Sequence, residues 1–246
     1  MQQLVQQSRL TPATAPRPLS PHRVAKGSYL ARQGADSGTC SVLVTGLAHR
    51  SKVVVRGCRQ ILGICVPGDM IDLSRILLDH IDHNVQAMTE CEVIFVPRDR
   101  LKSAALHNPS AARELWTRTF IETAIAREWQ ANIGRRNAAT RMAHLICELR
   151  HRLSPGAPKS PETFELPLTQ TDLADVLGLT PVHVNRVLRE LEERGLIERR
   201  KRHVTVPCWP TLCRAADFDP SYLFGVQHSA RPTSWIEILS QADAED

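Results

Sequence analysis

The sequence predicts an α+β protein in three parts: an N-terminal antiparallel β-roll of jelly-roll character, a long helix and a C-terminal winged helix-turn-helix. Short apolar runs separated by turn glycines occupy residues 22–109. An apolar stripe too wide for a helix with one buried face follows in residues 110–136. Two short amphipathic helices and a basic hairpin lie within residues 137–213. With 246 residues, the chain is long enough for two domains that each have a core.

The two ends of the chain are expected to lie outside these parts. Residues 1–21 are rich in Pro, Gln and Thr and hold few residues to bury, so we expect a flexible lead-in. Residues 214–246 form a tail that follows a short helix near residues 209–216 and ends in a polar, acidic stretch.

The β-roll is predicted from closely spaced turns between short apolar runs. Pro67-Gly68-Asp69 is a turn signal, because proline presets φ, glycine leaves φ free and an aspartate side chain can bond back to the backbone. The expected strands include Ser41–Thr45, Lys52–Val55, Ile61–Val66 and Val93–Val96.

Residues 98–136 are expected to be helical, and their wide apolar stripe favours burial on two sides. The first half of the helix would pack on the β-roll and the second half on the same helix of another copy. A single long core helix in a monomer is the alternative. We expect a hinge at Asn137-Ala138 and a helix capped by Thr140 after it. The expected homodimer interface contains Ile121, Ile125, Trp129 and Ile133.

Residues 166–206 carry the most specific pattern in the chain. Thr169 is placed to cap a first helix that ends at Gly178, where positive φ is expected. Thr180 is placed to cap a second helix with Pro181 at its first position. Small Ala174, followed four residues later by Gly178, is typical of the crossing in a helix-turn-helix, whose second helix enters the major groove.

The second helix has two different sides. Val184, Val187, Leu188 and Leu191 share the side expected to be buried. The opposite side presents groups that can meet base edges and phosphates, and residues 197–206 form a hairpin with a basic tip suited to phosphates. The alternative is an αα-hairpin with a solvated charge run. The expected DNA-binding residues are Thr169, Gln170, Thr180, Pro181, Val182, His183, Asn185, Arg186, Arg189, Arg200, Lys201 and Arg202.

The distribution of charge agrees with a polyanionic partner. The formal net charge is +5, and residues 135–203 hold 13 Lys and Arg against 9 Asp and Glu. Residues 204–246 instead hold 2 against 6. No run of 18 apolar residues and no secretory signal are present, so we expect a cytoplasmic protein without membrane association.

The cysteines give no sign of a metal or cofactor site. All seven are scattered, without a C-x-x-C pair, and the default expectation is buried thiols. A haem ligand among His49, His80, His83 or Cys91 would be an isolated residue, so we expect neither cofactor nor metal.

The order of parts resembles the Crp/Fnr family of bacterial transcription regulators over about residues 24–213. The resemblance is carried by GSYLARQG at residues 27–34, GCRQILGICVPGDMIDL at residues 57–73 and LTQTDLADVLGLTPVHVNRVLRELEERGLIE at residues 168–198. It implies a sequence-specific homodimer on a palindromic operator, with RNA polymerase as a further partner.

The resemblance also has departures. Family members that bind cyclic AMP carry Gly-Glu and Arg-Ser pairs, where this chain has Asp72-Leu73 and Ile81-Asp82. An aspartate in place of the phosphate-binding arginine adds repulsion, so cyclic AMP is not expected to be the effector. Many relatives read bases with Glu and Ser followed by Arg, where this chain has Val182, Asn185 and Arg186. An effector remains unknown, and a regulator controlled by its own abundance is an open alternative.

An enzyme is the second class of function. A β-roll of this size can house metal-dependent cupin chemistry, which requires converging histidine and carboxylate ligands on strands. The nearest pattern is His80-Ile81-Asp82-His83, in an expected loop without strand alternation. No nucleophile–base constellation or phosphate-binding glycine loop is present, so the sequence favours a DNA-binding regulator over an enzyme.

Overall fold

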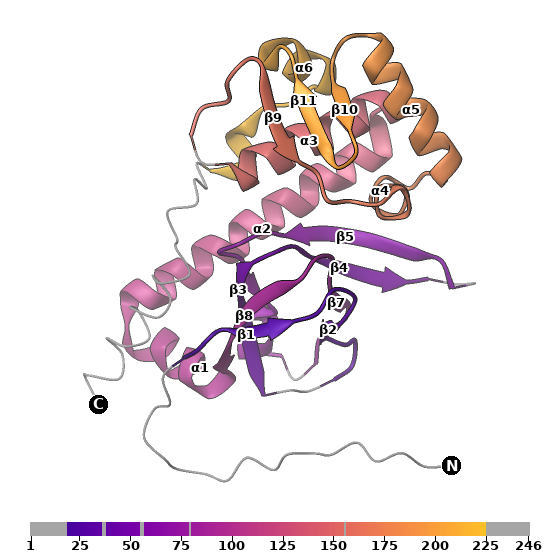
Figure 1. Cartoon of the computed structure of the whole chain (residues 1–246). Coiled ribbons are helices and arrows are strands. Elements are labelled where there is room, and N and C mark those ends of the chain that lie inside the picture. The colour runs from indigo at the N-terminus through magenta and orange to yellow at the C-terminus, as the bar shows by residue number, and fades with distance from the viewer. Residues whose placement is uncertain (1–18, 36–37, 55–56, 79, 155, 225–246) are drawn as a thin grey trace, which may run out of the picture.

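The structure is a computed structural model that describes residues 19–35, 38–54, 57–78, 80–154 and 156–224. The chain begins in a β-roll, continues through the long helix α2 beside it and ends in a C-terminal domain above it (Figure 1). The expected order of parts is therefore confirmed. Most of the expected lead-in, residues 1–18, and residues 225–246 of the tail lie outside the described residues.

The β-roll consists of two four-stranded antiparallel sheets, with strand orders β1-β8-β3-β6 and β2-β7-β4-β5. Their inner faces enclose a core that includes Leu43, Ile71, Val85 and Val93. Sequence reasoning found β3, β5 and β8. The expected strand Lys52–Val55 shares only its first two residues with β4, and Val55 lies outside the described residues. The remaining strands were missed, because they are two to four residues long and too short to show alternation. The strands are β1 His22–Val24, β2 Tyr29–Ala31, β3 Thr39–Thr45, β4 Ala48–Val53, β5 Arg59–Cys65, β6 Met70–Ile71, β7 Asn84–Ala87 and β8 Cys91–Pro97.

Two turns of the β-roll depend on particular residues. Gly46, between β3 and β4, has φ of +86°, and a Cβ there would lie 2.3 Å from the carbonyl oxygen of Glu90. The predicted turn at residues 67–69 is present, and the Asp69 carboxylate accepts a hydrogen bond of 2.9 Å from the Val66 amide. Glycine is thus required at position 46 by both conformation and space.

The helical region after the β-roll is divided in two, where a continuous helix was expected. The 3-10 helix η2 (Leu73–Ile76) precedes β7, and α1 (Arg98–His107) and α2 (Pro109–Arg135) follow β8. Asn108 separates the last two, because its side chain accepts hydrogen bonds from the Ser110 and Ala111 amides. Proline at position 109 also disfavours helical backbone at the residue before it, so α1 ends at this point.

The junction after α2 lies where the hinge was expected, but the cap is a different residue. α3 spans Ala138–Leu153. The Asn137 side chain accepts a hydrogen bond of 2.9 Å from the Thr140 amide, so Asn137 is the cap and Thr140 lies inside α3. The expectation that Thr140 caps this helix is therefore wrong. Asparagine is as good a cap as threonine, and Asn137 directly precedes the first helical residue.

The C-terminal domain contains the predicted helix-turn-helix and the predicted hairpin, to which a third strand is paired. β9 pairs with β11 through Phe164 and Val204, and Phe164 is buried in the domain core. The expected two-stranded wing is thus a three-stranded sheet. The elements are β9 Glu162–Glu165, α4 Gln170–Leu177, α5 Pro181–Glu193, β10 Glu198–Arg200, β11 His203–Val206, α6 Trp209–Ala216 and the 3-10 helix η3 Pro220–Leu223.

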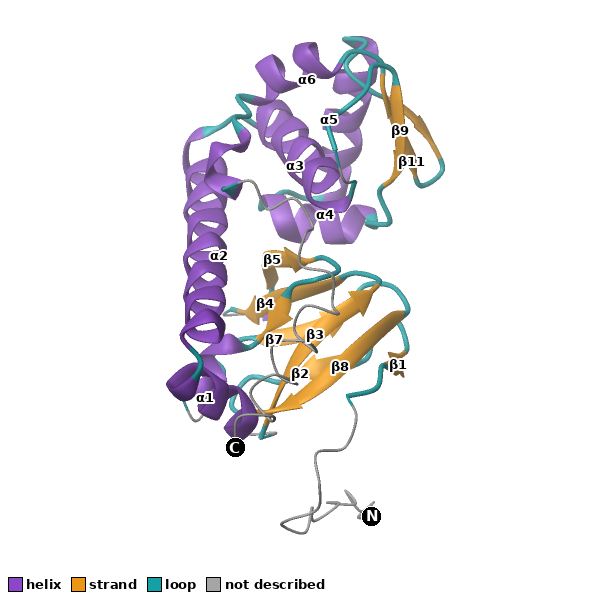
Figure 2. Cartoon of the chain, turned by 90° about the vertical axis from the view of Figure 1, so that its left-hand side faces the viewer, coloured by secondary structure: helices purple, strands orange, loops and turns teal. Residues whose placement is uncertain are grey.

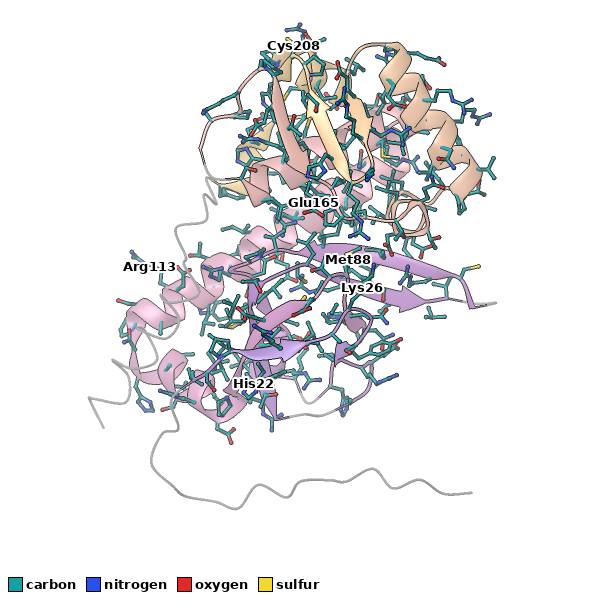
Figure 3. All side chains as sticks on the ribbon, in the orientation of Figure 1. His22, Lys26, Met88, Arg113, Glu165 and Cys208 are labelled. Atoms are coloured by element: carbon teal, nitrogen blue, oxygen red, sulfur yellow. The ribbon has the colours of Figure 1, made fainter. Side chains whose placement is uncertain are left out.

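One apolar core joins the C-terminal domain to the β-roll. Ile61, Ile64 and Met88 of the β-roll belong to the same buried cluster as Trp129 of α2 and Leu173 of α4. The side view shows α4 directly above β5, with α2 alongside both domains (Figure 2). Met88 lies at the upper edge of the β-roll, toward the C-terminal domain (Figure 3). Among the described residues, no helix combines the length and apolarity needed to cross a bilayer.

Candidate nucleic-acid interface

The two helices of the helix-turn-helix begin and turn as predicted. The Thr169 hydroxyl accepts a hydrogen bond from the Asp172 amide, and the Asp172 carboxylate accepts one from the Thr169 amide, which completes a capping box. Gly178 ends α4 with φ of +63°. The Thr180 hydroxyl accepts a hydrogen bond from the His183 amide, and Pro181 occupies the first position of α5.

α5 buries the predicted side and leaves the other side open. Val184, Val187, Leu188 and Leu191 are buried. On the opposite side, the Val182 side chain is 81% exposed, Arg186 and Arg189 are exposed, and Asn185 and His183 are half-buried. This side therefore presents cationic and amide groups to solvent.

Arg186 is free to reach a ligand. The alternative of an ion pair with Glu190 is not seen, because Glu190 pairs with Arg194 at 3.4 Å. Within the described ranges, the Arg186 side chain makes no hydrogen bond or ion pair. Its guanidinium therefore keeps all of its donors for a base or a phosphate.

The basic hairpin tip lies next to the start of α4. Arg200, Lys201 and Arg202 are exposed, and Lys201 has φ of +56° at the turn. The Leu166 amide donates a hydrogen bond of 2.7 Å to the carbonyl oxygen of Arg202, which ties the tip to the segment that leads into α4. We name the tip, the N-terminus of α4 and the exposed side of α5 together the basic face.

The inner side of α4 is held on the β-roll by residues that the sequence did not single out. The Arg59 guanidinium donates to Asp172 at 3.0 Å and to Asp175 at 2.7 Å. Gln60 donates to the carbonyl oxygen of Asp175 at 2.7 Å. Asp172 therefore has two functions, as helix cap and as docking residue, and only the first has a sequence signature.

His49 lies behind this contact and stays neutral. Burial lowers the pKa of His49 to about 4, and the adjacent Arg59 guanidinium acts in the same direction. The His49 Nε2 atom is 3.2 Å from an Arg59 nitrogen and can accept a hydrogen bond from it only when the imidazole is neutral. The haem-ligand alternative considered for His49 gains no support, because this ring faces Arg59.

A buried carboxylate connects the domains at a second place. Glu148 of α3 has no exposed surface and accepts hydrogen bonds from Trp129 Nε1, Arg152 and the Tyr222 hydroxyl. Arg152 also donates to Asp69 in the β-roll at 2.9 Å. The Glu148 cluster, defined as these five residues, links the β-roll, α2, α3 and η3.

The expected dimer residues lie mostly on the inner side of α2. Trp129 is 6% exposed and donates its indole N–H to Glu148, so it belongs to the core of its own chain. Ile125 packs against the same core, Ile121 is half-buried and Ile133 is 38% exposed. The outer side of α2 instead carries exposed Trp116 and Phe120, with ring centroids 6.2 Å apart. The apolar stripe is wide because it covers both the inner and the outer side of α2. Periodicity alone did not show which of these two sides faces outward.

The β-roll holds a polar group at the place where the resemblance puts a nucleotide phosphate. Asp82 bonds to Lys52 at 2.6 Å and to His83 at 2.9 Å, and Asp72 lies 3.6 Å from His83 Nε2. Burial lowers the pKa of His83, but hydrogen bonds to Asp72 and Asp82 outweigh burial and raise it above its usual value. Arg75, the buried cation here, donates to the carbonyl oxygen of Ala35 at 3.0 Å.

Comparison with known proteins identifies both domains. Residues 21–108 match the cyclic nucleotide-binding domain, and residues 140–215 match the Crp-like helix-turn-helix domain. A probable transcriptional activator from Rhizobium leguminosarum bv. viciae is 30% identical over 186 residues, 75% of this chain and 76% of that protein. The chain belongs to the Crp/Fnr family. It is a Crp/Fnr-type, DNA-binding transcription regulator, as its relatives in bacteria are named.

Two further relatives support the same assignment. The transcriptional activator FnrL from Cereibacter sphaeroides is 31% identical over 181 residues, 72% of each chain. The solved structure of FixK2 from Bradyrhizobium japonicum superposes with a TM-score of 0.73 at 25% identity, covering 80% of this chain and 96% of that one. A cupin-like enzyme finds no support in these relatives, and the described residues contain no group of three side chains suited to a metal ion.

The Crp/Fnr likeness leaves one described part unexplained. The helix-turn-helix match ends at residue 215, before η3. Tyr222 of η3 nevertheless closes the Glu148 cluster, and Asp217 pairs with Arg136 at 3.0 Å. The start of the tail is therefore a structural part of the C-terminal domain, which its polar composition did not indicate.

Proposed function

We propose that this Crp/Fnr regulator binds an inverted repeat as a homodimer, with α5 of each copy in a major groove. The observation that carries the proposal is Arg186, an exposed guanidinium without a protein partner among the described residues, on the side of α5 opposite its buried stripe. The half-sites are expected one helical turn apart, roughly 34–36 Å.

The residues of the basic face have separate roles in this proposal. Arg186 takes guanine O6 and N7 together, which a planar fork of two N–H donors matches. Val182 touches a thymine methyl group. Arg189, Arg200, Lys201 and Arg202 contact phosphates, which add affinity without sequence preference. Four further positions at the starts of the two helices contact the sugar-phosphate backbone through their side chains: Thr169, Thr180, Pro181 and His183.

Replacement of Arg186 by Ala tests the reading role. We expect a loss of about 1–3 kcal/mol on the preferred operator, with relaxed preference at a single base pair of each half-site. The preferred operator is first selected from a random DNA pool with the wild-type protein alone. Affinities for operators that vary at each position are then measured by fluorescence anisotropy at one fixed salt concentration.

Lys201→Ala is the matched control for that experiment. It removes one exposed cation at the hairpin tip, so binding should weaken equally on all operators, and the salt slope should fall by roughly one unit. A uniform loss from Arg186→Ala would instead make Arg186 a phosphate contact. A changed preference from Lys201→Ala would mean that the tip reads a groove.

The homodimer in this proposal forms through the outer side of α2. Trp116 and Phe120 are 56% and 63% exposed, and small Ala124, Ala131 and Gly134 continue their side of the helix at spacings of three, four and seven. Large aromatic groups exposed on a long helix are a feature of contact surfaces. Ile121, Ile125, Trp129 and Ile133 recur every four residues and follow the inner side of α2 instead. Contact with RNA polymerase and a cytoplasmic location are predictions from the sequence.

We propose further that cyclic AMP is not the effector. Hydrogen bonds from His83 and Lys52 lower the pKa of Asp82 to about 2, so this group is a carboxylate at neutral pH. A negative charge at that place opposes a cyclic phosphate, and the nearby Arg75 is already engaged by backbone carbonyl groups.

Titration calorimetry with cyclic AMP and cyclic GMP is expected to give no binding heat at physiological concentrations, because Asp82 repels the phosphate of both. The same preparation should still bind its selected operator, which shows that the protein is active. Micromolar binding of either nucleotide, accompanied by tighter operator binding, would contradict this interpretation of the β-roll.

A further inference from the structure

Two side chains of the basic face form a closed pair that joins the helices. Gln170 is the first residue of α4 and Asn185 is the fifth of α5. Gln170 Nε2 donates to Asn185 Oδ1 at 2.6 Å, and Asn185 Nδ2 donates to Gln170 Oε1 at 2.8 Å. The two bonds make a ring of two carboxamides.

The ring fixes the orientation of both amide groups. If either carboxamide turned over, two N–H donors would face each other on one side and two oxygens on the other. Each amide thus determines which way the other points. Asn185 is half-buried, whereas Gln170 is exposed at the end of α4. The longer side chain therefore reaches across to the recognition helix and holds the shorter one.

The ring changes what Asn185 can read. A lone asparagine binds adenine by offering its oxygen and its N–H₂ together to N6 and N7. In this structure, that edge of Asn185 already faces Gln170. Each carboxamide retains one N–H and one lone pair, and the free N–H of one lies beside the free lone pair of the other. The unit thus presents a donor and an acceptor that come from two helices.

We propose that Gln170 is a specificity-determining positioning residue, which acts with Asn185 as one donor–acceptor unit that reads adenine in each half-site. Adenine offers an acceptor at N7 and a donor at N6, which match this unit, whereas guanine offers two acceptors. The inference rests on the proposed docking of α5 in the major groove. It assigns to Gln170 a role beyond a phosphate contact, since a phosphate contact carries no sequence information.

The test is a double-mutant cycle with the full-length protein on the operator selected by the wild-type protein. Affinity is measured for all four base pairs at every half-site position, with Gln170→Ala, Asn185→Ala and the double variant. Each single change should reduce the adenine preference at the same position by roughly 5- to 150-fold. The double variant should lose no more than either single one, because the unit is already broken.

A length-conserving exchange provides the rescue. The variant with Gln170→Asn and Asn185→Gln keeps both carboxamides and the total number of methylene groups, so it should recover part of the adenine preference. Gln170→Glu keeps an acceptor but loses the donor to Asn185, so it should not recover that preference. Circular dichroism should be unchanged in all variants, because both side chains lie at the surface.

The outcomes separate this inference from the proposed function. If Gln170→Ala weakens all operators equally and keeps the preference, or if the two single losses add, Gln170 is a phosphate contact and the inference is wrong while the proposed docking stands. If the wild-type protein selects no sequence from the pool, the proposed docking fails, and the inference fails with it.

Discussion

Replacement of Trp116 and Phe120 by Glu is expected to convert the regulator into monomers and to weaken operator binding by roughly 10²- to 10⁴-fold, the gain that two linked half-site contacts supply. Both rings are exposed and stacked on the outer side of α2. In a two-fold contact each substituted residue would meet its own copy or its neighbour, so four carboxylates would lie close together in a desolvated interface. Sedimentation velocity gives the state of association.

Leu106→Glu is the control for this double variant. Leu106 is an exposed apolar residue of α1 and not of α2, so its substitution should leave both association and operator binding unchanged. The circular dichroism of all variants should match that of the wild-type protein. A double variant that still sediments as a dimer would place the interface on another surface.

Replacement of Glu148 by Leu is expected to lower the free energy of unfolding by about 3–5 kcal/mol, because it leaves buried Arg152 with Asp69 as its remaining described carboxylate partner. The indole N–H of Trp129 would also lose its acceptor, and the Tyr222 hydroxyl would lose its 2.8 Å bond and keep only His144 Nε2, at 3.3 Å, among its described partners. Equilibrium unfolding in urea, followed by tryptophan fluorescence, measures the loss.

The chain offers a closely matched control for that substitution. Glu190 and Arg194 have the same four-residue spacing as Glu148 and Arg152, but their side chains are about half exposed. Glu190→Leu should change stability by less than about 1 kcal/mol, since an exposed helical pair contributes roughly 0.3–0.5 kcal/mol. Equal losses from the two substitutions would mean that the Glu148 cluster does not hold the domains together.

The helix-turn-helix could be predicted in detail because its determinants are local. Caps at Thr169 and Thr180, the turn at Gly178 and the buried side of α5 each depend on residues within a few positions of one another. The missed strands, in contrast, have two to four residues and exist only through partners distant in sequence. β9 is an example, since Phe164 becomes a strand residue by pairing with Val204, 40 positions away.

The sequence by itself determined the order of domains, the family and the exposed side of the recognition helix, because periodicity, capping and turn chemistry act within a helix or a hairpin. Only the tertiary structure decided how the domains meet and which groups share a site. Arg59 and Asp172 are 113 positions apart, too far for a sequence motif to relate them. Gln170 meets Asn185 only because α4 and α5 cross. Periodicity likewise placed Trp129 on the apolar stripe of α2 but did not show that its indole N–H bonds to Glu148. Contacts of this kind depend on packing in three dimensions, which local patterns do not encode.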